Sequence, residues 1–176
     1  MALVPSHSAA PPPRCATPVP PPFPHPWGGS LGPDECLSFP CPVLREDGFG
    51  ARPQYECYLA ELPPGQTNKE GGSVVGYVLF TYTYSTWKGR NLYMDNLYVQ
   101  PQFRGQKIGK RLIEKAAQAA VSKGCGQLRM HVANWKAKDK DFLARQGGED
   151  LTAKEGWTLF NLDEDALRRL AAQSTI

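Results

Sequence analysis

The stretch that decides the fold is residues 91–120, NLYMDNLYVQPQFRGQKIGKRLIEKAAQAA. Its apolar and aromatic residues predict a strand over Asn91–Val99, and Pro101 ends this strand because proline cannot donate to a β ladder. Apolar residues then recur at helical spacing and predict a helix over residues 108–123. We therefore expect a strand, a short Arg-Gly loop and a long helix in direct succession.

The loop between these two elements, Phe103–Lys110 (FRGQKIGK), is a candidate anion-binding site. The first N–H groups of a helix have no acceptor within the helix, and the helix dipole adds positive potential at the same place. For so short a glycine- and lysine-containing motif, a solvated basic turn is the simpler alternative. The surrounding strand and helix favour the anion site.

The rest of the chain adds strands before this unit and further elements after it. A short helix is expected to end within Pro42–Gly50, and strands are predicted at Tyr55–Leu62 and Val74–Tyr84. Downstream, the expected elements are a strand at Gln127–Ala133, a helix at Trp135–Gln146, a strand at Trp157–Leu162 and a helix at Glu164–Ala172. Antiparallel strands followed by a strand–helix–strand unit indicate an α+β fold with a mixed, mostly antiparallel central sheet flanked by helices.

The N-terminal segment differs in composition, since 11 of the chain's 17 prolines precede residue 34. Such a segment favours polyproline II or disorder. We therefore divide the chain into a proline-rich leader, residues 1–41, and a folded domain, residues 42–176. The leader has the composition of a ligand for aromatic-lined adaptor grooves, although an unstructured tail is the simpler interpretation.

Composition argues against several classes of protein. A net charge of +3 on 176 residues is too small to indicate nucleic-acid binding. The five cysteines include no Cys-x-x-Cys pair and there are only three histidines, so no metal site is expected. No apolar run reaches membrane-spanning length and no secretory signal is recognisable, so we expect a cytoplasmic protein without membrane contact.

The loop motif resembles the acetyl-CoA motif of the GNAT acetyltransferase superfamily, Arg/Gln-x-x-Gly-x-Gly/Ala. The agreeing residues are Tyr98-Val99-x-Pro101, Arg104-Gly105 and Ile108-Gly109, whereas Lys107 stands where the middle glycine is usual. From residue 44 to about residue 171 the chain is similar to the diamine (spermidine/spermine) acetyltransferases, especially their thialysine-acetylating branch. The segments that carry this similarity are Asp47–Gly50, Tyr84–Arg90, Lys123–Cys125, Asp150–Thr152 and Glu155–Trp157.

The resemblance implies transfer of an acetyl group from acetyl-CoA to an amine, which attacks the thioester directly. It assigns acetyl-CoA to Leu97, Tyr98, Val99, Arg104, Gly105, Gln106, Lys107, Ile108, Gly109 and Lys110. It assigns the small amine substrate to Trp87, Asp95, Arg129, Met130 and His131. For Asp95 and Trp87, the residues alone favour a solvated strand charge and a core or turn aromatic. A homodimer, with the strand near residues 157–162 contributing across subunits, is also implied.

The chain departs from this family at three places. Asp95 stands where the family has glutamate, and it remains a candidate base acting through water. Leu143 occupies the position of the family's general-acid tyrosine and carries no proton to donate. The proline-rich leader stands where the family has its first strand and helix, so we expect a sheet without a recognisable first strand and helix.

Two functions follow from these observations. The leading interpretation is an acetyl-CoA-dependent N-acetyltransferase that acts on a primary amine of a small diamine, polyamine or thialysine-like substrate. The alternative is a catalytically impaired acetyl-CoA-binding or dimerisation partner of an active acetyltransferase, for which Leu143 and the missing N-terminal strand and helix of the family are the arguments.

Overall fold

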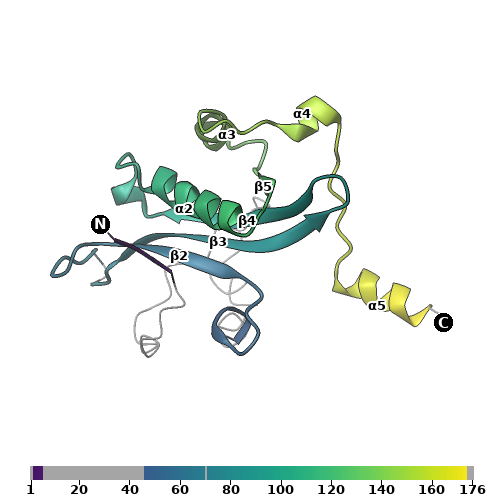
Figure 1. Ribbon diagram of the computed structural model, residues 1–176, viewed down its shortest axis with the longest axis horizontal. Coiled ribbons are helices and arrows are strands. Elements are labelled where there is room, and N and C mark those ends of the chain that lie inside the picture. The colour runs from purple at the N-terminus through teal and green to yellow at the C-terminus, as the bar shows by residue number, and fades with distance from the viewer. Residues whose placement is uncertain (1, 6–45, 70, 174–176) are drawn as a thin grey trace. The chain divides into compact units, whose positions relative to one another are not determined.

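A computed structural model describes residues 2–5, 46–69 and 71–173 (Figure 1). The chain divides into two compact units, Met1–Ala133 and Asn134–Ile176, and each is described by itself. The predicted leader lies outside the described residues, apart from its first short strand. No helix in the described part of the chain is long and apolar enough to cross a bilayer.

The first unit is built on a five-stranded sheet with the strand order β1-β2-β3-β4-β5. Its strands are β1 (Ala2–Pro5), β2 (Glu56–Glu61), β3 (Val74–Ser85), β4 (Gly89–Val99) and β5 (Gln127–Arg129). The first four strands pair in antiparallel fashion, and β5 joins β4 in parallel. This arrangement confirms the predicted α+β class and the mixed, mostly antiparallel sheet.

Strand β1 was not expected from the sequence. Its four residues pair with β2, with Ala2 opposite Glu61 and Pro5 opposite Tyr58. Proline is tolerated in an edge strand because only one side of that strand joins the ladder. Composition alone does not reveal such a strand, because its partner lies more than fifty residues away in the chain.

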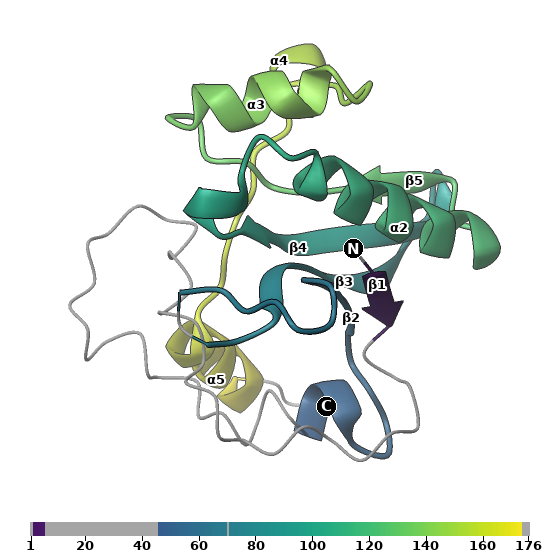
Figure 2. The same ribbon diagram turned by 90° about the vertical axis from the view of Figure 1, so that its left-hand side faces the viewer.

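Helix α2 (Ile108–Ser122) lies along one face of the sheet in both views (Figures 1 and 2). Its buried residues recur every three or four positions and form the stripe Ile108, Leu112, Ala116, Ala119 and Ala120. The stripe packs against buried strand residues, namely Ala60, Val75, Val78, Phe80, Leu92 and Met94. The helix predicted for residues 108–123 is therefore confirmed, and apolar burial fixes its position on the sheet.

The second unit contains the helices α3 (Ala137–Ala144), α4 (Leu151–Glu155) and α5 (Glu164–Ala172). Helix α5 has the predicted bounds, and α3 is shorter than the predicted Trp135–Gln146. Helix α4 was not predicted, although its ends carry ordinary signals. The Asp150 side chain accepts a hydrogen bond from the Ala153 N–H at 3.2 Å, and Gly156 ends the helix in the left-handed conformation, with φ of 73°.

The strand predicted at Trp157–Leu162 is wrong for this structure. Residues 157–162 have no regular secondary structure and are exposed to solvent. A β-strand needs a neighbouring strand to accept and donate its ladder hydrogen bonds. Within the described residues no strand pairs with this segment, so its apolar and aromatic composition alone does not produce a strand.

Candidate active site

Strand β4 carries a bulge at Asp95. Leu79 of β3 lies opposite Asn96, whereas the next residue of β3, Phe80, lies opposite Met94. Asp95 therefore has no partner residue on β3, which is the arrangement of a β-bulge. Its side chain is exposed and accepts a hydrogen bond from the Asn96 amide at 3.0 Å.

The bulge also changes which strand positions face helix α2. Side chains of a regular strand alternate between the two faces, and one extra residue inverts that alternation. Leu92 and Met94 belong to the core before the bulge, whereas Leu97 and Val99 pack against the same core after it. The bulge thus keeps both halves of β4 attached to one core while it presents Asp95 to solvent.

Strands β4 and β5 pair over only three positions, and the last pair is Tyr93 with Arg129. The strand predicted to continue to Ala133 ends at Arg129. Beyond this pair, no strand of the described chain adds to this edge of β4, which leaves backbone groups of Leu97–Val99 available to a ligand. This is the edge to which the sequence analysis assigned acetyl-CoA.

The loop between β4 and α2 forms a cradle of free backbone N–H groups. After the short 3-10 helix η2 (Pro101–Phe103), the Arg104 N–H donates to the Pro101 carbonyl at 3.2 Å. The next loop hydrogen bond runs from the Arg111 N–H to the Lys107 carbonyl at 3.1 Å. Within the described chain, the N–H groups of residues 105–110 have no acceptor. They lie at the positive end of the α2 dipole, which suits a phosphate group.

Two residues of the cradle adopt the left-handed conformation. Gly105 has φ of 79° and Lys107 has φ of 61°, and Lys107 is the only described residue other than glycine with positive φ. The glycine usual at the position of Lys107 would adopt this conformation without strain. The lysine retains the same backbone geometry at an energetic cost.

The Arg104 side chain ties the loop back to the strand. Its Nε donates to the Val99 carbonyl at 3.0 Å, which holds the loop beside the end of β4. The terminal guanidinium nitrogens remain for an anionic ligand, since Nε alone makes this contact. Loop and strand end are thus joined into one surface.

Beside Asp95, two aromatic side chains mark the place where β4 and β5 separate. The Tyr93 hydroxyl is hydrogen-bonded to Nδ1 of His131, and the two rings lie 5.5 Å apart. Burial, and then the negative charge of Asp95, raises the pKa of Tyr93. Burial chiefly raises the pKa of Tyr77 as well, and Asp95 contributes to it. Tyr93 and Asp95 belong to the bulged strand β4, and Tyr77 belongs to its neighbour β3.

Comparison with known proteins agrees with this geometry. Residues 33–147 match the profile of the Acetyltransferase (GNAT) family. The chain belongs to the GNAT acetyltransferase family. It is 45% identical over 131 residues to the thialysine N-epsilon-acetyltransferases of Bos taurus and of Mus musculus, which covers 74% of this chain and 77% of each relative. It is 30% identical over 128 residues to the human spermidine/spermine N(1)-acetyltransferase-like protein 1, covering 73% of this chain and 18% of that protein.

Solved structures support the same GNAT fold. An integron cassette protein from the mobile metagenome of V. cholerae superposes with a TM-score of 0.58 at 17% identity, over 82% of this chain and 80% of its own. AAC(6')-Iy in complex with the bisubstrate analogue CoA-S-monomethyl-acetylneamine superposes with a TM-score of 0.54 at 14% identity, over 78% of this chain and 84% of its own. The family match and the thialysine acetyltransferase relatives show that the protein is an N-acetyltransferase, as predicted, and GNAT acetyltransferases use acetyl-CoA.

The structure brings some of the predicted substrate residues of this GNAT chain together and separates others. Asp95, Arg129 and His131 lie around the divergence of β4 and β5, and Met130 lies between the last two and packs against the core. Trp87 lies in the β3–β4 turn and is 77% exposed. The strand from Gly89 to Asp95 separates it from the bulge, which corresponds to roughly 20 Å.

Leu143 belongs to the second unit of the acetyltransferase. It lies in α3, where it is half-buried, and a Cβ added to Gly148 would meet its carbonyl oxygen at 3.1 Å. The assignment of Leu143 to the family's acid position rests on sequence similarity.

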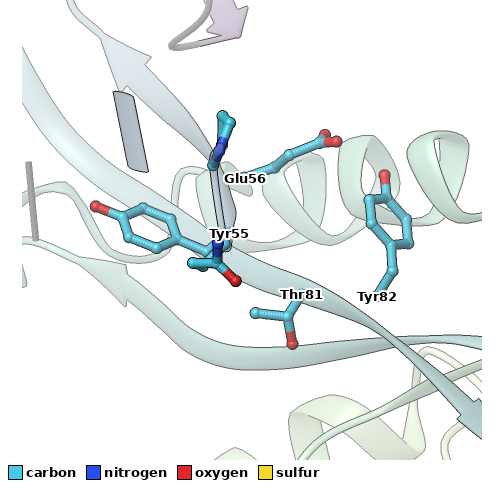
Figure 3. A pocket seen from close by; sticks show the side chains of 6 residues that line it. Tyr55, Glu56, Thr81 and Tyr82 are labelled. Atoms are coloured by element: carbon cyan, nitrogen blue, oxygen red, sulfur yellow. The ribbon is translucent and has the colours of Figure 1, made fainter. Parts of the chain in front are cut away.

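A small pocket of about 230 Å³ lies elsewhere on the sheet of this GNAT domain (Figure 3). Its lining residues are Pro53, Gln54, Tyr55, Glu56, Thr81 and Tyr82. Burial, and then the negative charge and hydrogen bond of Glu56, raises the pKa of Tyr82. None of the predicted site residues lines this pocket, so we do not assign it to acetyl transfer. Within the described residues no cluster of three metal-ligating side chains occurs.

Sequence reasoning missed Tyr93. The sequence did carry a signal for Tyr93, namely its spacing from Asp95. The two residues are two positions apart in a predicted strand, so their side chains lie on the same face. Its partner His131 lies in a segment predicted as strand, whereas the structure ends β5 at Arg129. Only the parallel pairing of β4 with β5 brings the two rings together.

Proposed function

We propose that this acetyltransferase transfers the acetyl group of acetyl-CoA to a primary amine of a small diamine, polyamine or thialysine-like substrate. The observation that carries the proposal is the cradle of free N–H groups at residues 105–110, joined to the unpaired edge of β4. The acceptor class comes from the similarity to thialysine N-epsilon-acetyltransferases.

Each part of the site has a task in this proposal. The N–H groups of residues 105–110, together with Arg104 and the ammonium groups of Lys107 and Lys110, hold the pyrophosphate. Backbone groups of Leu97–Val99 align the thioester, and Asp95 attracts the cationic amine. Holding two reactants in line corresponds to effective molarities of ~10⁵ to 10⁸ M, so positioning is the main contribution expected of the site.

Isothermal titration calorimetry with acetyl-CoA, followed by a thiol-release assay on thialysine and spermidine, tests the proposal. We expect saturable binding of acetyl-CoA and release of free thiol with at least one amine. Binding without thiol release on either amine would favour the alternative, a catalytically impaired acetyl-CoA-binding or dimerisation partner. Absence of binding would contradict both functions.

The alternative rests on Leu143, so a substitution at this position separates it from the leading function. We expect Leu143→Tyr to raise kcat by roughly tenfold to a hundredfold, because a general acid contributes ~10²- to 10⁴-fold. Leu143→Phe is the control, since it adds the ring without the proton. Equal rates in the two variants would show that a missing acid does not limit the reaction.

We further infer that the protein is a cytoplasmic homodimer in which the apolar segment 157–162 contacts a second copy. Support comes from the family resemblance and from the exposure of Phe160, Leu159 and Leu162. The proline-rich leader remains a candidate adaptor ligand. If deletion of residues 1–33 leaves capture of SH3-type adaptor domains unchanged, the leader has no such role.

A further inference from the structure

The hydrogen-bonded pair Tyr93–His131 lies where β4 and β5 separate, beside the strand edge that the proposed function assigns to acetyl-CoA. Tyr93 belongs to the last residue pair between β4 and β5, and His131 follows the end of β5 by two residues. The bulge residue Asp95 lies two positions after Tyr93 on β4. The pair therefore lies where the gap between β4 and β5 begins. The cradle loop follows the far end of β4, at the other end of this gap.

The geometry of the pair fixes one nitrogen of His131 and leaves the other open. Nδ1 is hydrogen-bonded to the Tyr93 hydroxyl, and the ring lies 5.5 Å from the Tyr93 ring. Tyr93 is half-buried in the sheet, whereas His131 is exposed. When Nδ1 carries the proton that it shares with the phenol oxygen, the lone pair of Nε2 faces outward.

Two oppositely charged side chains lie near the pair. The groups that face it are Asp95 of β4, which raises the pKa of Tyr93, and Arg129 of β5, which lies opposite Tyr93. The raised pKa keeps the phenol uncharged at neutral pH, so Tyr93 holds the ring as a neutral hydrogen-bonding partner. Asp95 and Arg129 are both exposed, so solvent screens their opposite charges.

We propose that His131 is the proton acceptor for the substrate amine, with Tyr93 as its positioning residue. The inference rests on the proposed function, since it assigns a role within amine acetylation. His131 then serves as an acid–base group at the place where β4 and β5 separate. This role does not require an acid at residue 143 of the second unit.

Nε2 of His131 takes one proton from the substrate ammonium, and the neutral amine nitrogen then forms a bond to the thioester carbonyl carbon. The carbon–sulfur bond breaks with its electron pair passing to sulfur. The amide nitrogen loses its second proton to solvent, the thiolate takes a proton from solvent, and His131 returns its proton to solvent. One proton is released for each acetyl group transferred.

The test is the pH dependence of the rate for His131→Asn, which retains a polar group near the Nδ1 position but cannot accept the amine proton. We expect kcat/KM to fall about a hundredfold at pH 7, with an unchanged Kd for acetyl-CoA. The deficit should shrink toward a few-fold as the pH approaches the ionisation of the amine itself. A purely structural role of His131 would reduce the rate equally at every pH.

Tyr93→Phe provides a second variant that leaves the imidazole in place. We expect a loss of several-fold in kcat/KM that falls on kcat, with an unchanged Kd for acetyl-CoA, because the ring is present but no longer held in place. Tyr84→Phe, at the exposed end of β3, is the matched control and should leave the rate unchanged. An active wild type whose rate profile is unaltered by His131→Asn would overturn this inference alone. A wild type that acetylates no amine would overturn the proposed function and this inference with it.

Discussion

At the scale of single residues, Lys107 is the most informative position of the cradle. A left-handed backbone costs a residue with a Cβ atom ~1–2 kcal/mol relative to the right-handed conformation, and glycine escapes this cost. Lys107 has φ of 61° and retains a charge beside a site for anions. Lys107 therefore lowers the stability of the loop and adds an ammonium group to the anion site.

We predict that Lys107→Gly is more stable than Lys107→Ala by about 1 kcal/mol, measured by chemical denaturation. Both variants lose the ammonium, so their difference isolates the backbone conformation. Both should bind acetyl-CoA more weakly than the wild type, because they lack the same charge. Equal stability of the two variants would mean that the loop relaxes away from the left-handed conformation.

Cys57 gives a second prediction at this scale. Burial raises the pKa of its thiol from 9.0 to about 12. The folded state keeps the thiol proton between about pH 9 and pH 12, a range in which the unfolded chain loses it, so the free energy of unfolding falls as the pH rises through this window. We expect a shallower fall for Cys57→Ala, measured by urea denaturation at several pH values. Parallel pH profiles of the two proteins would contradict this assignment.

At the scale of elements, helix α2 is held by one apolar stripe. Leu112 is 0% exposed in the middle of this stripe, whereas Val121 is 76% exposed on the same helix. We predict that Leu112→Ala lowers the free energy of unfolding by about 2–5 kcal/mol through lost burial and a cavity. Val121→Ala, measured in the same way, should change it by less than about 0.5 kcal/mol. Similar losses in both variants would contradict the packing of α2 on the sheet.

The bulge in β4 is the element that connects this packing to the site. Without it, regular alternation from Leu92 and Met94 would direct Asn96 and Tyr98 into the core. The observed core takes Leu97 and Val99 instead, because the extra residue Asp95 inverts the pattern. The same local distortion thus preserves the core and exposes the carboxylate.

At the scale of the whole molecule, several large apolar side chains of the second unit are exposed to solvent. Phe160 is 89% exposed, and Leu159, Leu162, Leu167 and Leu170 are each more than half exposed. Apolar groups that gather on a surface in this way mark contacts with other molecules. A second copy of the chain is the occupant that we propose.

We predict that Phe160→Ser converts a dimeric wild type into a monomer, measured by size-exclusion chromatography with light scattering. A large aromatic side chain in a buried contact contributes about 2 kcal/mol or more to association, enough to shift a micromolar dimer. Tyr84→Ser, which changes an exposed aromatic of the first unit, is the control. A wild-type monomer would contradict the dimer, and a dimeric Phe160→Ser variant would place the contact elsewhere.

Much of the sheet, α2 and the cradle could be predicted from the sequence by itself. Their signals are local: the apolar periodicity of α2, Pro101 after β4, and glycine spacing in the loop. Similarity to known acetyltransferases added the acetyl-CoA assignment to these residues. The predictions from sequence were wrong where pairing with a distant strand decides the outcome, as with the unexpected β1 and with residues 157–162, which form no strand.

What the sequence alone determined is therefore the strand–loop–helix unit, because neighbouring residues specify it. The tertiary structure decided the bulge at Asp95, the end of β5 at Arg129 and the pairing of Tyr93 with His131. These features depend on register between strands that are distant in the chain. Register is set by the packing of the whole core, and no stretch of the sequence carries it.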